Sequence, residues 1–181
     1  GCDASILLNG NGTEENERNH PANFGLRDEA IQAIEDIRAI IRVQCPRVVS
    51  CADILVIAAR EAVRQFGGPD FDVPLGRKDN TKFDIDSPDN LPVPFERTDG
   101  VFTSDQDLAS NPKTKEIVNR FASNQNEFFN KFANAFVKVS QLDVLTGNQG
   151  EIRKSCFAPN NKKKSNVASV VEEVVGIATN M

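Results

Sequence analysis

The chain has 181 residues, of which 39% are hydrophobic and 26% are charged, as in one ordinary globular domain. Its formal net charge of −5 argues against a nucleic-acid-binding protein, because no basic surplus is present to neutralise phosphates. No apolar run approaches the ~20 residues that a membrane span needs, so we expect no membrane-spanning segment.

The first residues, GCDASILL, lead directly into structured-looking sequence without an initiator Met or a signal peptide. We therefore expect a fragment, or a gene whose first exon is missing, so the absent signal says nothing about location. A polar loop at 9–23 follows, and it contains a glycosylation sequon at Asn11 that favours a secreted protein.

Two helices are predicted next. From Asp28 onward, Ala30, Ile34, Ile37 and Ile41 recur at helical spacing, and this helix should end near Cys45. In the stretch 48–63, Ser50 and Asp53 have the S-x-x-D spacing of a helix N-cap. Ala52 and residues 54–59 are apolar without a clean stripe, and a polar face returns only at Arg60, Glu61 and Arg64. Such a helix is normally buried, so we expect it to be the core helix around which the rest is arranged.

The second half of the chain is also predicted to be mostly helical. Residues 67–94 are rich in Pro, Gly and Asp, which allows short strands at most. Asn111 and Pro112 have the pattern of a helix N-cap followed by Pro at the first helical position. In the helix that they begin, we expect Ile117, Val118 and Phe121 to face inward. Asn124 and Glu127 open another helix with an apolar stripe expected to pack in the core: Phe128, Phe129, Phe132, Phe136 and Val139. The fold class is all-α.

The cysteines and the C-terminal residues leave alternatives open. Cys2, Cys45, Cys51 and Cys156 form no C-x-x-C pair and His20 is the only histidine, which argues against zinc. Core thiols and disulfides both remain open on spacing alone. The end of the chain has a basic patch at 162–164 and a valine-rich amphipathic run at 167–178, either a terminal helix or a tail.

Six blocks of sequence resemble, in their order, the secreted plant haem peroxidases (class III). They are GCDASILL at 1–8, VVSCADILVIAAREAV at 48–63, GGPDFDVPLGRKD at 67–79, LPVP at 91–94, VFTSDQDL at 101–108 and VLTGNQGEIRKSC at 144–156. The resemblance implies a helical fold that holds haem b and calcium and uses hydrogen peroxide to oxidise small phenolic donors. The implied roles are peroxide removal, the response to oxidative stress and the chemistry of cell-wall phenolics.

The resemblance also implies a location and a set of site residues. The protein would be secreted to the cell wall or apoplast, or alternatively delivered to the vacuole by its C-terminal extension. Part of a calcium site, with oxygen ligands that suit a hard cation, would be formed by Gly1 (through its carbonyl), Asp3, Ser5 and Glu17. Supporting roles around the haem would belong to Glu17, Asn23 and Asp105, and the aromatic donor would rest against Pro92.

The resemblance also implies two pairings of side chains and two cysteines without a partner. Cys51 and Cys156 would form a disulfide that closes a ~100-residue loop, which stabilises by about 4.7 kcal/mol in the chain-entropy model. Cys2 and Cys45 correspond to cysteines whose partners lie before residue 1. Asp53 and Arg77 resemble a structural ion pair.

The match fails at the residues that perform the chemistry. The family's distal Arg and His precede the GCDAS block, and its proximal His lies between the LPVP and SDQDL blocks. Here Pro94 is followed almost at once by FERTDGVFTSDQ. We therefore expect an internal deletion near 95–101, within a partial peroxidase domain at 1–160 that precedes an extension at 161–181. His20 is expected to face solvent from its loop and not to replace a haem ligand, so haem binding is doubtful and no catalytic residue is present.

Several readings therefore stay open. The gene encodes a peroxidase of which this chain is an incomplete form, or the chain is a non-catalytic remnant that binds at most calcium or a partner. A transcript without a stable product is the third reading. Loss of the helical layer near 95–101 would also leave the Phe stripe short of partners. That predicts marginal stability or exposed apolar surface prone to association.

Overall fold

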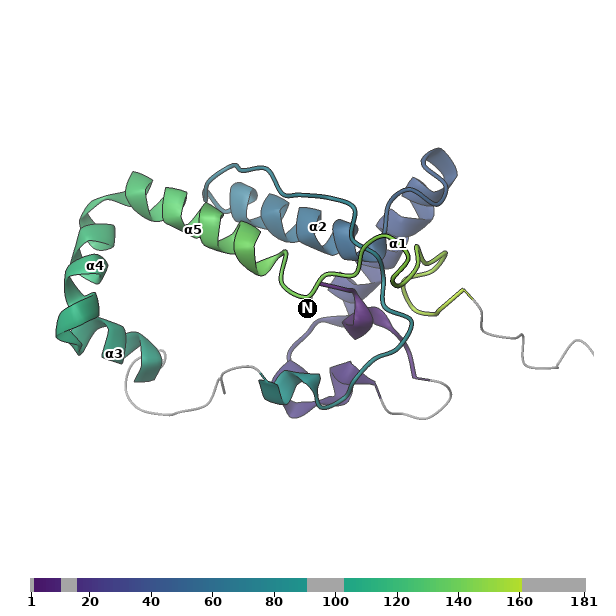
Figure 1. The fold of residues 1–181 in the computed structure, drawn as a ribbon, viewed down its shortest axis with the longest axis horizontal. Helices are drawn as coiled ribbons and strands as arrows, with labels where there is room; N and C mark the ends of the chain where they lie inside the picture. Colours follow the sequence, from purple (N-terminus) through teal and green to yellow (C-terminus); the bar gives the residue numbers. More distant parts are fainter. Residues whose placement is uncertain (1, 11–15, 91–102, 161–181) are drawn as a thin grey trace, which may run out of the picture.

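The computed structural model describes residues 2–10, 16–90 and 103–160, with the side chains of 90 and 103–105 left aside. The longer helices are α1 (Asp28–Gln44), α2 (Cys51–Gln65), α3 (Thr103–Ser110), α4 (Pro112–Ser123) and α5 (Gln125–Val139) (Figure 1). Single 3-10 turns are η1 (Ser5–Leu7), η2 (Glu17–Asn19), η3 (Pro21–Asn23) and η4 (Ser87–Asn90). The described part contains isolated β-bridges and no strand, so the all-α prediction is confirmed.

The helix starts are set by the side chains that the sequence predicted. The Ser50 hydroxyl accepts a hydrogen bond from the Asp53 N–H at 3.1 Å, which satisfies one of the free donors at the start of α2. Asn111 caps α4 through the N–H of Lys113 at 2.9 Å, with Pro112 at N1, and Asn124 caps α5 through the N–H of Glu127 at 3.0 Å.

The core is formed by residues from opposite ends of the chain. Leu7 from η1, Ile34 from α1 and Ile54 from α2 are buried together with Cys51 and Cys156. The Cys51–Cys156 disulfide spans 105 residues and fixes the start of α2 to the C-terminal loop, as predicted. The N-terminal turn, the first half of α2 and the C-terminal loop therefore form one packed unit, against which α1 lies (Figure 1).

The prediction that α2 is covered on most sides is wrong for its second half. Buried residues end at Val56, Ala59 is exposed, and Phe66 at the C-terminal end is 93% exposed. In Figure 1 the end of α5 lies alongside this half, but an apolar pocket of about 330 Å³ separates them, lined on its two sides by Val56 and Phe136, among others. The apolar side chains of this half therefore stay partly exposed, because α5 does not pack directly against them.

The prediction that the apolar faces of α4 and α5 are buried in the core is also wrong. Neither helix has a buried residue: Ile117 is 41% exposed, Phe128 is 41% exposed and Val139 is 60% exposed. The phenylalanines contact mainly one another, as in the edge-on pair of Phe121 and Phe128 with ring centroids 5.8 Å apart. Among the described elements, α3, α4 and α5 pack in sequence and extend away from the core as an arm (Figure 1).

None of the helices in the described ranges is both long enough and apolar enough to cross a membrane.

Candidate functional site

A cluster of buried charged side chains joins the ends of the chain, and we call Arg38, Asp79 and Arg153 the buried charge cluster. All three are at most 1% exposed. One Asp79 oxygen accepts the Ala52 N–H at 2.9 Å, and the other accepts the Arg153 N–H at 2.9 Å. Because the Ala52 N–H lies in the first turn of α2, Asp79 adds a second cap, with a negative charge at the positive end of the helix dipole.

The arginines of this cluster donate hydrogen bonds to main-chain carbonyls. Arg38 on α1 donates twice to the Arg153 carbonyl, at 2.8 and 2.5 Å, and Arg153 donates to the Ala4 carbonyl at 2.5 Å. Burial raises the pKa of Asp79, against the opposing effect of the backbone N–H groups of Arg153 and Ala52. Burial likewise lowers the pKa of Arg38 and of Arg153. The cluster is a structural junction.

The close approach of the C-terminal loop to Asp79 requires a glycine. Gly150 has φ of +60°, and a Cβ atom there would lie 2.5 Å from the Asp79 carbonyl oxygen. Any side chain at this position would push apart the pairing of Asp79 with Glu151. The conformation at Gly150 thus fixes where Arg153 enters the core.

The Asp53–Arg77 ion pair is present as the resemblance implied. The Arg77 side chain is 3% exposed, the Asp53 side chain is 5% exposed, and their charged atoms are 3.0 Å apart. Asp53 also accepts the Gly76 N–H at 2.8 Å, and Arg77 donates to the carbonyl and the hydroxyl of Ser140 at 2.8 and 3.0 Å. The pair therefore connects the start of α2 to the end of α5.

The loop with Glu17, His20 and Asn23 is compact and internally bonded. The Asn23 amide donates to the Glu17 carbonyl at 2.7 Å, and the buried Glu17 carboxylate accepts the Asp84 N–H at 3.1 Å. The structure thus brings Glu17 and Asn23 together.

The prediction that His20 faces solvent is wrong. Its side chain is only 16% exposed, because it caps η3 and packs against η4. Nδ1 accepts the Ala22 N–H at 3.1 Å, and Nε2 lies 3.1 Å from Asp89 Oδ1. A haem iron needs an axial side chain with a free donor atom. Since both ring nitrogens are engaged, His20 does not fit that role, and the described residues offer no other histidine.

The predicted calcium ligands are only partly brought together. One Asp3 oxygen accepts the Ser5 N–H at 3.1 Å, and the other accepts the Asn80 amide at 2.9 Å. The Glu17 carboxylate is bonded to a different segment. The described ranges contain no group of three or more His, Cys, Asp or Glu side chains that could hold a metal ion. These carboxylates therefore do not make a complete cation site by themselves.

Three predicted site residues cannot be placed at the level of their side chains. Gly1 and Pro92 lie outside the described residues, as do the predicted junction at 95–101 and the C-terminal extension at 161–181. Asp105 belongs to α3, but its side chain is outside the description as well. Their predicted roles stay predictions.

Sequence reasoning missed the buried charge cluster, although one signal was available. Arg38 lies four residues after Ile34 and three before Ile41, and so falls within the apolar stripe of α1. A cation in such a stripe must be paired or bonded when the stripe is buried. The identity of its acceptor, a carbonyl 115 residues away, is a property of the fold alone.

These observations define the class as an all-α domain whose ends are joined by a disulfide and by buried arginine contacts. The family model described as peroxidase matches residues 1–101. Cationic peroxidase SPC4 of Sorghum bicolor is 32% identical over 267 residues, covering 96% of this chain and 74% of its own length. Peroxidase 12 of Arabidopsis thaliana is 31% identical and covers 100% of this chain and 75% of its own length.

The chain belongs to the peroxidase family. It is by family an oxidoreductase that acts on hydrogen peroxide, and its plant relatives agree with the resemblance to class III enzymes.

Proposed function

We propose that this polypeptide of 181 residues preserves the structural frame of a plant haem peroxidase but does not oxidise phenolic donors by itself. The proposal rests on the hydrogen bonding of His20, the only histidine in the sequence. His20 donates or accepts at both ring nitrogens, to Asp89 and from Ala22, and so has no atom available for iron. Peroxide chemistry on haem needs an axial ligand and an acid–base group, and neither is supplied by the residues described.

The length of the alignments supports the proposed internal deletion near 95–101. The match to the Sorghum relative spans 267 residues, more than the 181 of the whole chain, so part of that relative has no counterpart here. The family model stops matching at residue 101, at the end of the proposed junction. A partial peroxidase domain at 1–160 with an extension at 161–181 is consistent with both findings.

The competing function is a remnant that binds at most calcium or a partner. Asp3, Ser5 and Glu17, with Gly1 and no further ligand, would give an incomplete and therefore weak cation site. Asp105, Asn23 and Pro92 are proposed to keep the positions of the family's supporting and donor-binding residues without the chemistry that they serve. The cell wall or apoplast is the proposed location, with the vacuole as the alternative.

The test is a haem titration of the refolded, oxidised chain. We expect no Soret band of ligated haem and no peroxide-dependent oxidation of guaiacol above that of free haem. A matched titration of His20→Ala separates specific ligation from loose association of haem with apolar surface. If the parent shows a sharp Soret band and guaiacol turnover that His20→Ala loses, the proposal is wrong.

A further inference from the structure

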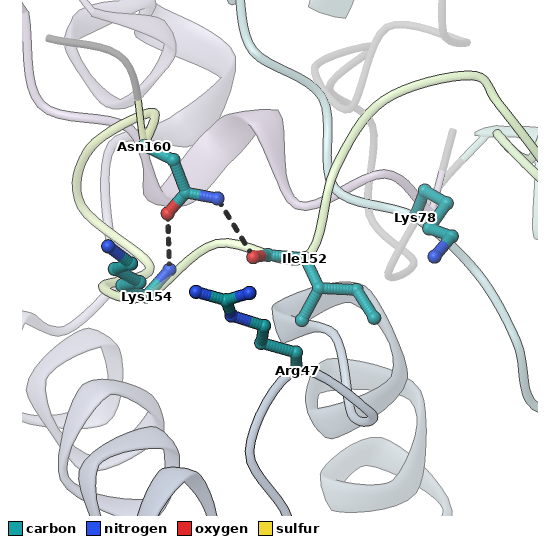
Figure 2. A pocket seen from close by; sticks show the side chains of 5 residues that line it. All are labelled: Arg47, Lys78, Ile152, Lys154 and Asn160. Atoms are coloured by element: carbon teal, nitrogen blue, oxygen red, sulfur yellow. Dashed lines mark hydrogen bonds between the residues drawn. The ribbon is translucent and has the colours of Figure 1, made fainter.

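A basic pocket of about 390 Å³ lies next to the segments that carry Asp79 and Arg153. It is lined by Arg47, Lys78, Ile152, Lys154 and Asn160 (Figure 2). Arg47 follows α1, Lys78 precedes Asp79, and the other three residues belong to the C-terminal loop. Three of these five residues are cations and none is acidic, although the chain carries a net charge of −5.

The backbone around the pocket is held in place. Asn160 accepts the Lys154 N–H at 2.9 Å and donates its amide to the Ile152 carbonyl at 3.0 Å, as the dashed lines in Figure 2 show. Lys78 pairs with Leu145 through a main-chain bridge. The nearby carboxylate of Glu151 accepts the Asn160 N–H at 2.8 Å and is not among the lining residues. These bonds hold the backbone at Lys78 and Lys154 in place.

The three cations have no ionic partner within the described ranges. No ion pair or side-chain hydrogen bond there involves the charged groups of Arg47, Lys78 or Lys154. Most other described arginines are bonded to a carboxylate, a carbonyl or an amide, as are Arg18, Arg38, Arg60, Arg64, Arg77, Arg120 and Arg153. Unpaired like charges around one cavity repel each other, and an anion placed between them would relieve that repulsion.

The backbone at Arg47 adds an independent observation. Arg47 has φ of 61°, in the left-handed region where glycine is favoured and a bulky side chain is unusual. In Figure 2 its guanidinium extends into the pocket toward Asn160 and the Lys154 backbone, with Lys78 on the far side of Ile152. Strained conformations of this kind concentrate at binding and catalytic positions.

We propose that this pocket binds a small multivalent oxyanion that carries phosphate or carboxylate groups. The guanidinium of Arg47 offers a planar pair of donors that matches two oxygens of such a group. Lys78 and Lys154 line the same pocket, and their positive charges favour an anion with more than one negative charge. The proposal does not depend on haem binding or on peroxidase activity.

The experiment is calorimetric titration of the full refolded chain with inorganic phosphate and, separately, with citrate. We expect saturable binding with one site per chain that weakens as salt increases from about 0.02 M to about 0.2 M. The probe that binds more tightly shows whether phosphate or carboxylate is the preferred group. Arg47→Gly should weaken binding about tenfold or more, because charge-assisted bonds are lost.

Two comparisons keep the result interpretable. Glycine suits a φ of 61°, so Arg47→Gly should keep the helical circular-dichroism spectrum and the melting temperature of the parent. Lys131→Ala removes one charge from the exposed surface of α5 and should leave both affinities within about twofold. Absence of saturable binding to either probe overturns the proposal, as does an equal loss of affinity in Lys131→Ala and Arg47→Gly.

Discussion

Asp79 shows how one residue can connect parts of the chain that are far apart in sequence. Its carboxylate accepts one N–H from the start of α2 and one from the C-terminal loop, and its charge lies 3.8 Å from the guanidinium of Arg153. The Arg153 side chain is fully buried, and its Nε and Nη1 atoms have no hydrogen-bond partner among the described residues. Asp79 therefore provides the charge that Arg153 needs.

Replacing Asp79 with asparagine should destabilise the fold by about 3–5 kcal/mol, because a buried cation would lose its counter-charge. Asparagine also replaces one accepting oxygen by a donor, so the N–H of Ala52 or of Arg153 would be left without an acceptor. Urea unfolding followed by circular dichroism measures the change. Asp86→Asn, in an exposed loop, is the matched control and should change stability by less than about 0.5 kcal/mol. Equal stability of the two variants would contradict the role given to Asp79.

The residues that sequence reasoning placed correctly act over short distances or carry a family signature. Ser50 and Asn124 each cap a helix by accepting the N–H of the residue three positions further on, a spacing that can be read from the sequence. The Cys51–Cys156 and Asp53–Arg77 pairs came from the resemblance. Asp79 and Arg153 are 74 residues apart and carry no local pattern, so their contact follows only from the assembled fold.

At the scale of the element, the two halves of α2 are stabilised by different contacts. Its first half is buried and bonded to the loops around it, whereas its second half is partly exposed and has side-chain bonds within the helix and, through Arg60, to Asp70. There Arg64 and Gln65 both donate hydrogen bonds to the Glu61 carboxylate. These bonds, chiefly the one from Arg64, lower the pKa of Glu61 to about 2. Pairs at this spacing support a helix end that has little tertiary packing.

The pH dependence of Glu61 can be predicted with its sign. Its pKa in the folded chain is below the ordinary 4.5, so its contribution to stability is present above about pH 4.5 and is lost as the pH falls toward 2. Glu61→Gln should therefore lower the melting temperature at neutral pH and match the parent near pH 2. Added salt should reduce the difference, because the pair is exposed.

Side-chain carboxyl NMR titration of Glu61 measures the same quantity directly. A titration of Glu61 at the ordinary value for glutamate would show that the Arg64 bond does not form in solution.

The helices themselves could be predicted well from sequence, and their burial could not. Caps, prolines and periodicity act within one element, so the start of α1 at Asp28 and of α4 at Pro112 were readable. Burial depends on which neighbour covers the apolar face. The stripe of α5 has the spacing of a core helix, yet Val139 is 60% exposed because no described element closes over it.

For the molecule as a whole, large apolar side chains are exposed at the ends of α2 and α5. Phe66, Val139 and Leu142 are 93%, 60% and 60% exposed. Exposed apolar groups of this size favour association. We expect the refolded chain to elute as a concentration-dependent mixture of monomer and larger species in size-exclusion chromatography with light scattering.

Val139→Lys should shift that equilibrium several-fold toward monomer, because a charge would replace an apolar group at the edge of the pocket between α2 and α5. Val43→Lys adds the same charge at an 80% exposed position on α1 and should have a much smaller effect. A parent chain that stays monomeric at every concentration would show that the arm folds back over its own apolar surface.

The junction of Ala4, Arg38 and Arg153 also bears on the order in which the molecule is made. Its parts are separated by almost the whole described chain, and the cysteine that locks them together is residue 156. During synthesis the Ala4 carbonyl has no donor and the Arg38 guanidinium has no acceptor until the C-terminal loop has left the ribosome. A nascent chain that stops before Arg153 therefore lacks the residue that joins Arg38 to Ala4 and the cysteine that pairs with Cys51, and chaperones will meet it as an incompletely folded substrate.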